Sequence, residues 1–270
     1  AFGSALWRWL KQTRAGRWTV GVLSILFWLS LWYAAARALN KPLLLPTPTA
    51  VLVRLGTLLQ QLDFWRATLT SLLRVLSGIV GGIVLSLLTA ALTAASPLMH
   101  TLLQPLITVV KSTPVASFII LALLWLDRSI LPALIALLMV FPVLWGNAHT
   151  GLTTVPMAYH ELATVYRLPL VRRIRRIYLP YTLPFFLSAC RSSLGLAWKA
   201  GIAAEVLCLP VYSIGKNLSD SRISLETTDL FAWTVVVIVL SLCVERVAEL
   251  LFSKLQRHAP DGERKEAEPS

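Results

Sequence analysis

Six long apolar segments restrict this chain to a membrane-spanning fold. They cover residues 19–39, 68–95, 98–126, 130–150, 181–209 and 230–252. A helix needs about 20 apolar residues to cross a hydrocarbon layer roughly 30 Å thick, so each segment can form one transmembrane helix. The three longest segments are expected to tilt or to extend beyond the hydrocarbon. The sequence therefore predicts an all-α membrane protein with six transmembrane helices.

Charged residues are too scarce for a soluble protein. They make up 14% of the 270 residues, whereas 56% are hydrophobic; soluble domains average about 25% charged residues. This excludes a cytosolic globular domain and a disordered chain. The net charge of +12 would also suit a nucleic-acid-binding protein, but membrane proteins keep an excess of Lys and Arg on cytoplasmic loops. We therefore expect no nucleic-acid partner.

The distribution of Lys and Arg predicts the orientation. Six spans put both termini on one side, and a cytoplasmic N-terminus places thirteen cations inside and six outside. The first segment could instead be a cleaved signal peptide, but its 21 apolar residues exceed the usual 7–15. The expected parts are a cytoplasmic segment (1–18), a six-span domain (19–252) and a polar cytoplasmic tail (253–270) that is disordered from residue 259.

An amphipathic helix is expected after the first span. Val51, Leu55, Leu58 and Leu62 recur at helical spacing, whereas Arg54, Thr57 and Gln61 lie on another face. This pattern is typical of a helix that lies on a membrane interface, here the outer one.

The sequence contains no recognisable catalytic or metal-binding constellation. The cysteines at 190, 208 and 243 lack metal or disulfide spacing, and the four histidines are scattered singly. A glycine-rich phosphate-binding loop is also missing. We expect no catalytic residue, metal or cofactor on this chain, and an intramembrane enzyme would need a nucleophile–base or metal cluster.

The loop at residues 156–180 carries the most information. Pro169 should separate two short helices. In the second, Val171, Ile174 and Tyr178 share one face, and the arginines at 172, 173, 175 and 176 flank it. Such a pair of helices suits a docking element for another protein, and it equally suits a basic loop attracted to anionic lipid.

In this loop the chain resembles the permeases of binding-protein-dependent ABC importers. Their EAA loop reads E-A-A, three residues, Gly, nine residues and I-x-L-P; in register here are Glu161, Ala163, Ile177, Leu179 and Pro180. Leu162 replaces the second Ala and Arg167 replaces the Gly. Glycine adopts left-handed backbone conformations that Arg adopts only at a cost, so the replacement leaves the geometry of the turn between the helices open.

Three further stretches resemble the nitrate, taurine and alkanesulfonate branch of this family. They are Leu45-Pro-Thr-Pro48, Lys111-Ser-Thr-Pro114 and Trp198-Lys-Ala-Gly-Ile-Ala-Ala-Glu205. The resemblance implies a type I ABC importer permease in a bacterial inner membrane. It also implies a second permease copy, expected to be identical, two cytoplasmic ATPases that hold ATP and Mg, and an extracytoplasmic binding protein. Substrates of the branch include nitrate, sulfonates, taurine, bicarbonate and vitamin-like heterocycles.

The resemblance also implies that the 156–180 loop couples the ATPase to the spans. Glu161 would meet a cationic or hydrogen-bonding group of the ATPase, and Ala163 would permit close approach. The expected coupling residues are Tyr159, Glu161, Ala163, Arg167, Arg172, Arg173, Ile177, Leu179 and Pro180.

Charges inside the spans suggest a polar pathway, because each costs energy unless it faces protein or water. Arg191, Trp198 and Glu205 recur every seven residues and share a helix face. The candidate pathway residues are Lys111, Ser112, Thr113, Pro114, Arg191, Trp198, Lys199 and Glu205, and their cations favour an anionic solute. The alternative is structural pairing, with snorkelling of Lys199 and Glu205. Arg74 is expected to snorkel or pack, and Glu245, Arg246 and Glu249 to be surface or interface charges.

A stand-alone secondary transporter or channel is the alternative function. It would work without an ATPase and would need a self-sufficient polar pathway.

Overall fold

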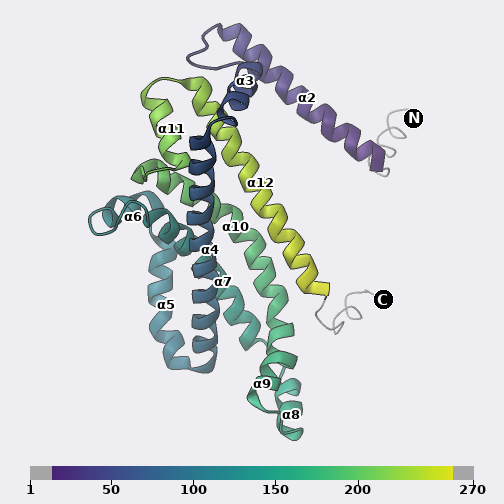
Figure 1. The fold of residues 1–270 in the computed structure, drawn as a ribbon. Helices are drawn as coiled ribbons and strands as arrows, with labels where there is room; N and C mark the ends of the chain where they lie inside the picture. The colour runs from purple at the N-terminus through teal and green to yellow at the C-terminus, as the bar shows by residue number, and fades with distance from the viewer. Residues whose placement is uncertain (1–13, 258–270) are drawn as a thin grey trace. The chain divides into compact units, whose positions relative to one another are not determined.

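The structure is a computed structural model that describes residues 14–257, with side chains described for residues 19–254 (Figure 1). The expectations for residues 1–13 and 258–270 lie outside the described part. No β-strand occurs among the described residues, which confirms the all-α class. The helices are α2 (Arg14–Leu39), α3 (Pro48–Leu58), α4 (Leu62–Ala95), α5 (Pro97–Ser112), α6 (Val115–Ala122), α7 (Leu131–Thr153), α8 (Met157–Val165), α9 (Leu170–Arg173), a π-helical turn (Ile174–Tyr178), α10 (Leu179–Cys208), α11 (Ile214–Ile223) and α12 (Thr227–Arg257).

Several of these helices can cross a membrane. By length and hydropathy, α2, α4 and α7 qualify among the described helices, and α5 with α6 forms a fourth, bent candidate. The two remaining expected spans lie in α10 and α12, which have 30 and 31 residues and exceed the length needed. Charged residues inside α10 lower its mean hydropathy. The chain is a multi-pass membrane protein, and the last two spans stay predictions.

The third apolar segment does not form one continuous helix. Helix α5 ends at Ser112, and α6 starts at Val115 after a bend of 101°. Pro114 lacks a backbone N–H and disfavours the helical conformation of the preceding residue, and Thr113 is extended, with ψ 126°. At the end of α5 the Val109 carbonyl accepts both the Thr113 N–H (3.0 Å) and the Thr113 hydroxyl (2.7 Å).

One compact unit comprises residues up to 64 together with 217–235. Helix α3 is amphipathic, as predicted, because Val51 and Leu58 are buried and Thr57 is exposed, but it ends at Leu58, so Gln61 and Leu62 lie beyond it. Arg54 forms a two-pronged ion pair with Asp229, with Nη2 2.6 Å from Oδ2. This hydrogen bonding raises the pKa of the Arg54 guanidinium, so the cation is maintained.

The second unit comprises residues 65–216 and those from 236 onwards. Its most extensive helix pair is α7 with α10. Helix backbones approach closely at glycines: a side chain at Gly78 would collide with the Ala133 backbone, and one at Gly151 would lie 2.9 Å from the Thr182 Cα atom. Small residues permit such close helix packing in membranes.

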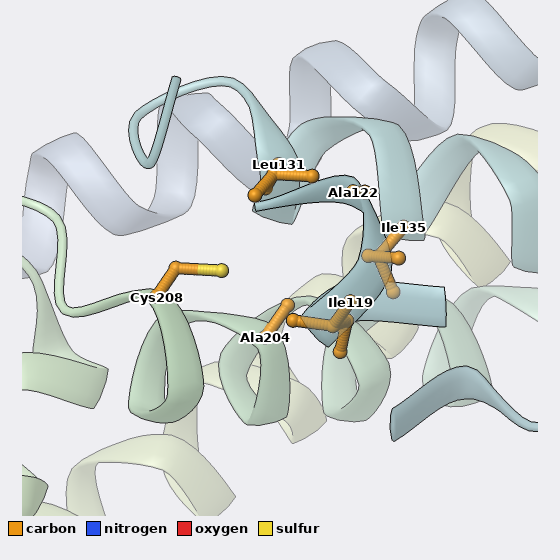
Figure 2. Packing of buried hydrophobic residues seen from close by; sticks show 6 residues of the cluster. All are labelled: Ile119, Ala122, Leu131, Ile135, Ala204 and Cys208. Carbon is orange, nitrogen blue, oxygen red and sulfur yellow. The ribbon is translucent and has the colours of Figure 1, made fainter. Parts of the chain in front are cut away.

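A buried cluster anchors the bent helix α6 to the second unit. Figure 2 shows Ile119 and Ala122 of α6 packed with residues of α7 and α10, namely Leu131, Ile135, Ala204 and Cys208. Leu131 and Ala204 are fully buried. Helix α6 therefore folds back onto α7 and α10 in place of continuing the direction of α5.

Candidate functional site

The segment between α7 and α10 forms a projecting element of two short helices. Helices α8 and α9 lie at one end of the α7 and α10 pair (Figure 1). Pro169 precedes α9 and separates it from α8, as predicted. Helix α9 continues through the π-helical turn into α10, so residues 170–208 form one unbroken helical run. We call residues 156–178 the α8–α9 element.

The turn after α8 keeps the geometry that a glycine would supply. Arg167 adopts a left-handed conformation (φ 46°). The Leu168 N–H donates to the Ala163 carbonyl (2.9 Å), and the Arg167 N–H donates to the Thr164 carbonyl (3.0 Å). These two bonds define a Schellman motif. Arg167 therefore forms the turn that glycine would form, although a non-glycine residue pays roughly 1–2 kcal/mol for this conformation.

Arg173 points back toward α8. Its Nε atom donates to the Leu168 carbonyl (3.0 Å), and its Nη2 atom donates to the Ala163 carbonyl (3.3 Å). The neighbouring Arg172, Arg175 and Arg176 are exposed. The sequence pattern grouped these arginines together, and the structure separates Arg173 from the rest.

A second contact that the sequence did not indicate joins α8 to the helical run. The Tyr178 hydroxyl lies 3.4 Å from His160 Nδ1, and the two rings meet edge to face with centroids 5.7 Å apart. A histidine and a tyrosine 18 residues apart carry no spacing signal, because the intervening turn sets their distance.

The α8–α9 element exposes large apolar side chains, beside charged ones such as Glu161 and Arg172, and nothing in the described chain covers them. Met157, Val165, Tyr166 and Val171 expose 71%, 78%, 70% and 76% of their surface. Contiguous exposed apolar surface marks interaction sites. Among the predicted coupling residues, Tyr159, Glu161, Arg167, Arg172 and Leu179 are exposed, Arg173, Ile177 and Pro180 are half-buried, and Ala163 is buried. Ala163 therefore serves close packing inside the element.

Glu205 belongs to a buried polar network. Arg74 Nη1 lies 2.6 Å from Glu205 Oε1, with 11% and 0% of the two side chains exposed. Ser71 Oγ (2.6 Å) and the Gly215 N–H (3.2 Å) donate to Oε2, and Ser71 Oγ accepts from the Ile214 N–H (2.9 Å). Of the two roles expected for Arg74, it therefore packs and does not snorkel, and the alternative in which Glu205 snorkels is wrong, because the two side chains pair with each other.

The other candidate pathway residues divide by exposure. Trp198 is fully buried and donates from Nε1 to the Val237 carbonyl (3.2 Å). Lys111, Ser112, Pro114, Arg191 and Lys199 are exposed, and Thr113 is half-buried. The helix face expected to unite Arg191, Trp198 and Glu205 therefore spans an exposed and a buried environment. The pathway role of all these residues stays a prediction.

Arg191 lies beside acidic residues of α12. It lines a small pocket with Leu194, Glu245, Ala248, Glu249 and Phe252. Glu245 is half-buried, packs against Gly195 and accepts a hydrogen bond from Ser241 Oγ (3.3 Å). Glu249 pairs with Arg246 (2.9 Å) at the surface, as expected for surface charges.

Comparisons with known proteins agree with the resemblance seen in the loop. The family described as binding-protein-dependent transport system inner membrane component matches residues 51–257. The chain is 24% identical over 246 residues to the taurine transport system permease protein TauC of Escherichia coli (strain K12), with 88% of each chain covered. It is 24% identical over 185 residues to the bicarbonate transport system permease protein CmpB of Synechococcus elongatus, covering 68% of this chain and 66% of that protein.

A third relative is named for a different substrate. The formylaminopyrimidine transport permease protein ThiX of Halalkalibacterium halodurans is 30% identical over 180 residues, covering 65% of this chain and 70% of that protein.

Proposed function

Because this chain belongs to the family of binding-protein-dependent transport system inner membrane components, we propose that it is the permease subunit of an ATP-driven importer. It forms the translocation pathway with a second copy of itself in a bacterial inner membrane. An extracytoplasmic binding protein delivers a small anionic solute. Two cytoplasmic ATPases hold ATP and Mg and engage the α8–α9 element.

The projecting α8–α9 element is the observation that carries this proposal. It exposes large apolar side chains, including Met157 and Val165, that nothing in the described chain covers. Its second helix, α9, continues into α10 without a helix break. An exposed apolar surface connected to a long helix suits transmission of movement from a partner protein.

The coupling residues act in three ways in this proposal. Glu161 is exposed on α8 and meets a cationic or hydrogen-bonding group of the ATPase, with Tyr159 beside it in sequence. Arg167 and Arg172 are exposed cations that pair with acidic groups. Ala163, Arg173, Ile177, Leu179 and Pro180 maintain the shape of the element and its junction with α10.

Both termini are cytoplasmic in this arrangement. The α8–α9 element must then face the cytoplasm, in agreement with its five arginines between residues 167 and 176. This is consistent with the thirteen inner cations against six outer ones.

Exposed cations support an anionic solute. Lys111, Arg191 and Lys199 lie in or beside candidate spans with side chains exposed on the subunit, and a pathway lined by cations attracts anions. Ser112, Thr113 and Pro114 complete the lining at the bend after α5. Trp198 and Glu205 are buried, so they support α10 behind the pathway. Taurine and bicarbonate, named for two relatives, carry acidic groups, whereas formylaminopyrimidine does not.

Charge reversal on α8 tests the coupling role. In the reconstituted complex, Glu161→Lys should abolish substrate-stimulated ATP hydrolysis while the permease remains folded. Asp127→Lys, which changes an exposed carboxylate between α6 and α7, is the control and should retain stimulation. Normal transport by Glu161→Lys would refute the coupling role, and activity of the purified chain without an ATPase would favour a stand-alone transporter.

Ligand binding to the partner protein tests the substrate class. The extracytoplasmic binding protein that co-purifies with this chain should bind a small anion, such as a sulfonate, nitrate or bicarbonate, more tightly than a neutral analogue. Preference for an uncharged heterocycle would refute the anionic assignment and leave the coupling role intact.

A further inference from the structure

We propose that Arg173 is a positioning residue that fastens α8 to the helical run of α9 and α10, so that both move as one body. The proposal rests on the proposed function, because it concerns how movement passes from the ATPase to the spans. Arg173 acts on the ATPase contact through α8 and not by touching the ATPase itself.

The contacts of Arg173 carry this assignment. Its guanidinium donates to the carbonyls of Ala163 and Leu168, which lie in the last turn of α8 and just beyond it. The last carbonyls of a helix have no intrahelical partner and need a donor from elsewhere. A guanidinium presents several N–H groups in a fixed plane, so one arginine can serve two carbonyls at once. Arg173 therefore caps α8 from the next helix.

The turn that Arg173 spans has a built-in weakness. Arg167 adopts a left-handed conformation, φ 46°, at the position where the family pattern has glycine. This conformation is unfavourable for any residue with a Cβ atom. The Ala163 carbonyl that accepts from Arg173 also accepts from the Leu168 N–H (2.9 Å) of the same turn. The guanidinium thus stabilises the backbone at the place where the substitution of glycine strains it.

The helical run offers a direct route from α8 into the membrane. Residues 170–208 are helical without a break, about 58 Å long at 1.5 Å per residue. At the far end of this run, the Glu205 carboxylate binds Arg74 of α4 and the Gly215 N–H. A displacement of α8 reaches this end only if α8 cannot pivot on the turn at residues 166–169. Arg173 restrains that pivot.

Three single variants and one double variant of the full-length chain in lipid nanodiscs, with the ATPase bound, test the proposal. Arg173→Gln removes the fork, Arg173→Lys keeps the charge without it, and Arg176→Gln removes a neighbouring exposed arginine. Two quantities are measured: amide hydrogen exchange at Arg167 and Leu168, and the ratio of substrate-stimulated to basal ATP hydrolysis.

Arg173→Gln should exchange about tenfold faster at these two amides, as expected for lost hydrogen bonds to a charged group. Its hydrolysis ratio should fall several-fold, that of Arg173→Lys should lie between Gln and wild type, and Arg176→Gln should match wild type. Adding Arg167→Gly to Arg173→Gln should restore most of the ratio, because glycine removes the strain of the turn.

Two results would overturn the proposal. One is unchanged exchange and an unchanged ratio in Arg173→Gln. The other is full activity of Arg173→Lys together with loss in Arg173→Gln, since only the charge would then matter. If Arg173→Gln does not assemble, the same two measurements are made on Arg173→Lys, alone and combined with Arg167→Gly, and they decide in the same way. Failure of the wild-type chain to bind an ATPase would instead refute the proposed function. The exchange measurement on the permease alone would still test whether Arg173 fastens α8 to the helical run.

Discussion

Replacing Glu205 with Gln should destabilise the contact between α4 and α10 by roughly 3–5 kcal/mol, the usual effect of breaking a buried ion pair from one side. The glutamine keeps the size of the side chain and an oxygen that can accept from Ser71 Oγ and the Gly215 N–H. What it removes is the charge opposite Arg74, whose side chain is 11% exposed. The variant therefore leaves an uncompensated cation inside the protein.

A double variant separates the charge from the packing. Arg74→Met combined with Glu205→Gln removes both charges, and replacement of a buried ion pair by neutral groups is often neutral or stabilising by about 1–4 kcal/mol. We expect the double variant to recover most of the loss of the single one. The difference between them is the coupling energy of the pair.

Reversible unfolding of the full chain in mixed micelles measures these free energies. Glu249→Gln is the matched control, because it breaks the Arg246–Glu249 pair, whose side chains are 79% and 54% exposed. Exposed pairs contribute about 0–1 kcal/mol. A loss for Glu205→Gln no larger than that of Glu249→Gln, or a double variant as unstable as the single one, would refute the buried-pair argument.

Two further predictions follow from the packing of the helices. Gly78→Ala should destabilise the chain by about 1–3 kcal/mol in the same unfolding assay, because the new methyl group collides with the Ala133 backbone; Gly56→Ala, which meets nothing within 4 Å, should stabilise it by about 0.5–1 kcal/mol, and equal effects would contradict the close approach. Pro114→Ala should reduce the 101° bend between α5 and α6, since alanine restores the backbone donor. Spin labels at the exposed positions 108 and 120 should then move apart, and an unchanged distance would show that packing of α6 alone maintains the bend.

Some features of this protein can be predicted from the sequence because they depend only on local chemistry. Long apolar runs specify membrane helices because an unpaired backbone in hydrocarbon is too costly for other structures. Pro97 and Pro169 mark helix starts, since proline fits the first turn and interrupts a helix elsewhere. These signals involve residues that are close together in the sequence. The EAA-like loop is also a local motif, and it therefore indicated the family. Each could be recognised without knowing what lies nearby in space.

Long-range contacts are invisible in such local patterns. Arg74 and Glu205 are 131 residues apart, and each alone resembles a residue that reaches for the membrane surface. Arg173 has the same sequence environment as Arg172, yet it turns inward because the carbonyls of α8 lie within its reach. Arg167 accepts a conformation suited to glycine because the hydrogen bonds of the turn offset the strain. Which charges pair, where a side chain points and which backbone position is strained all depend on the tertiary structure. The reason is that the free energy of each charge and carbonyl is set by the partner that folding brings to it.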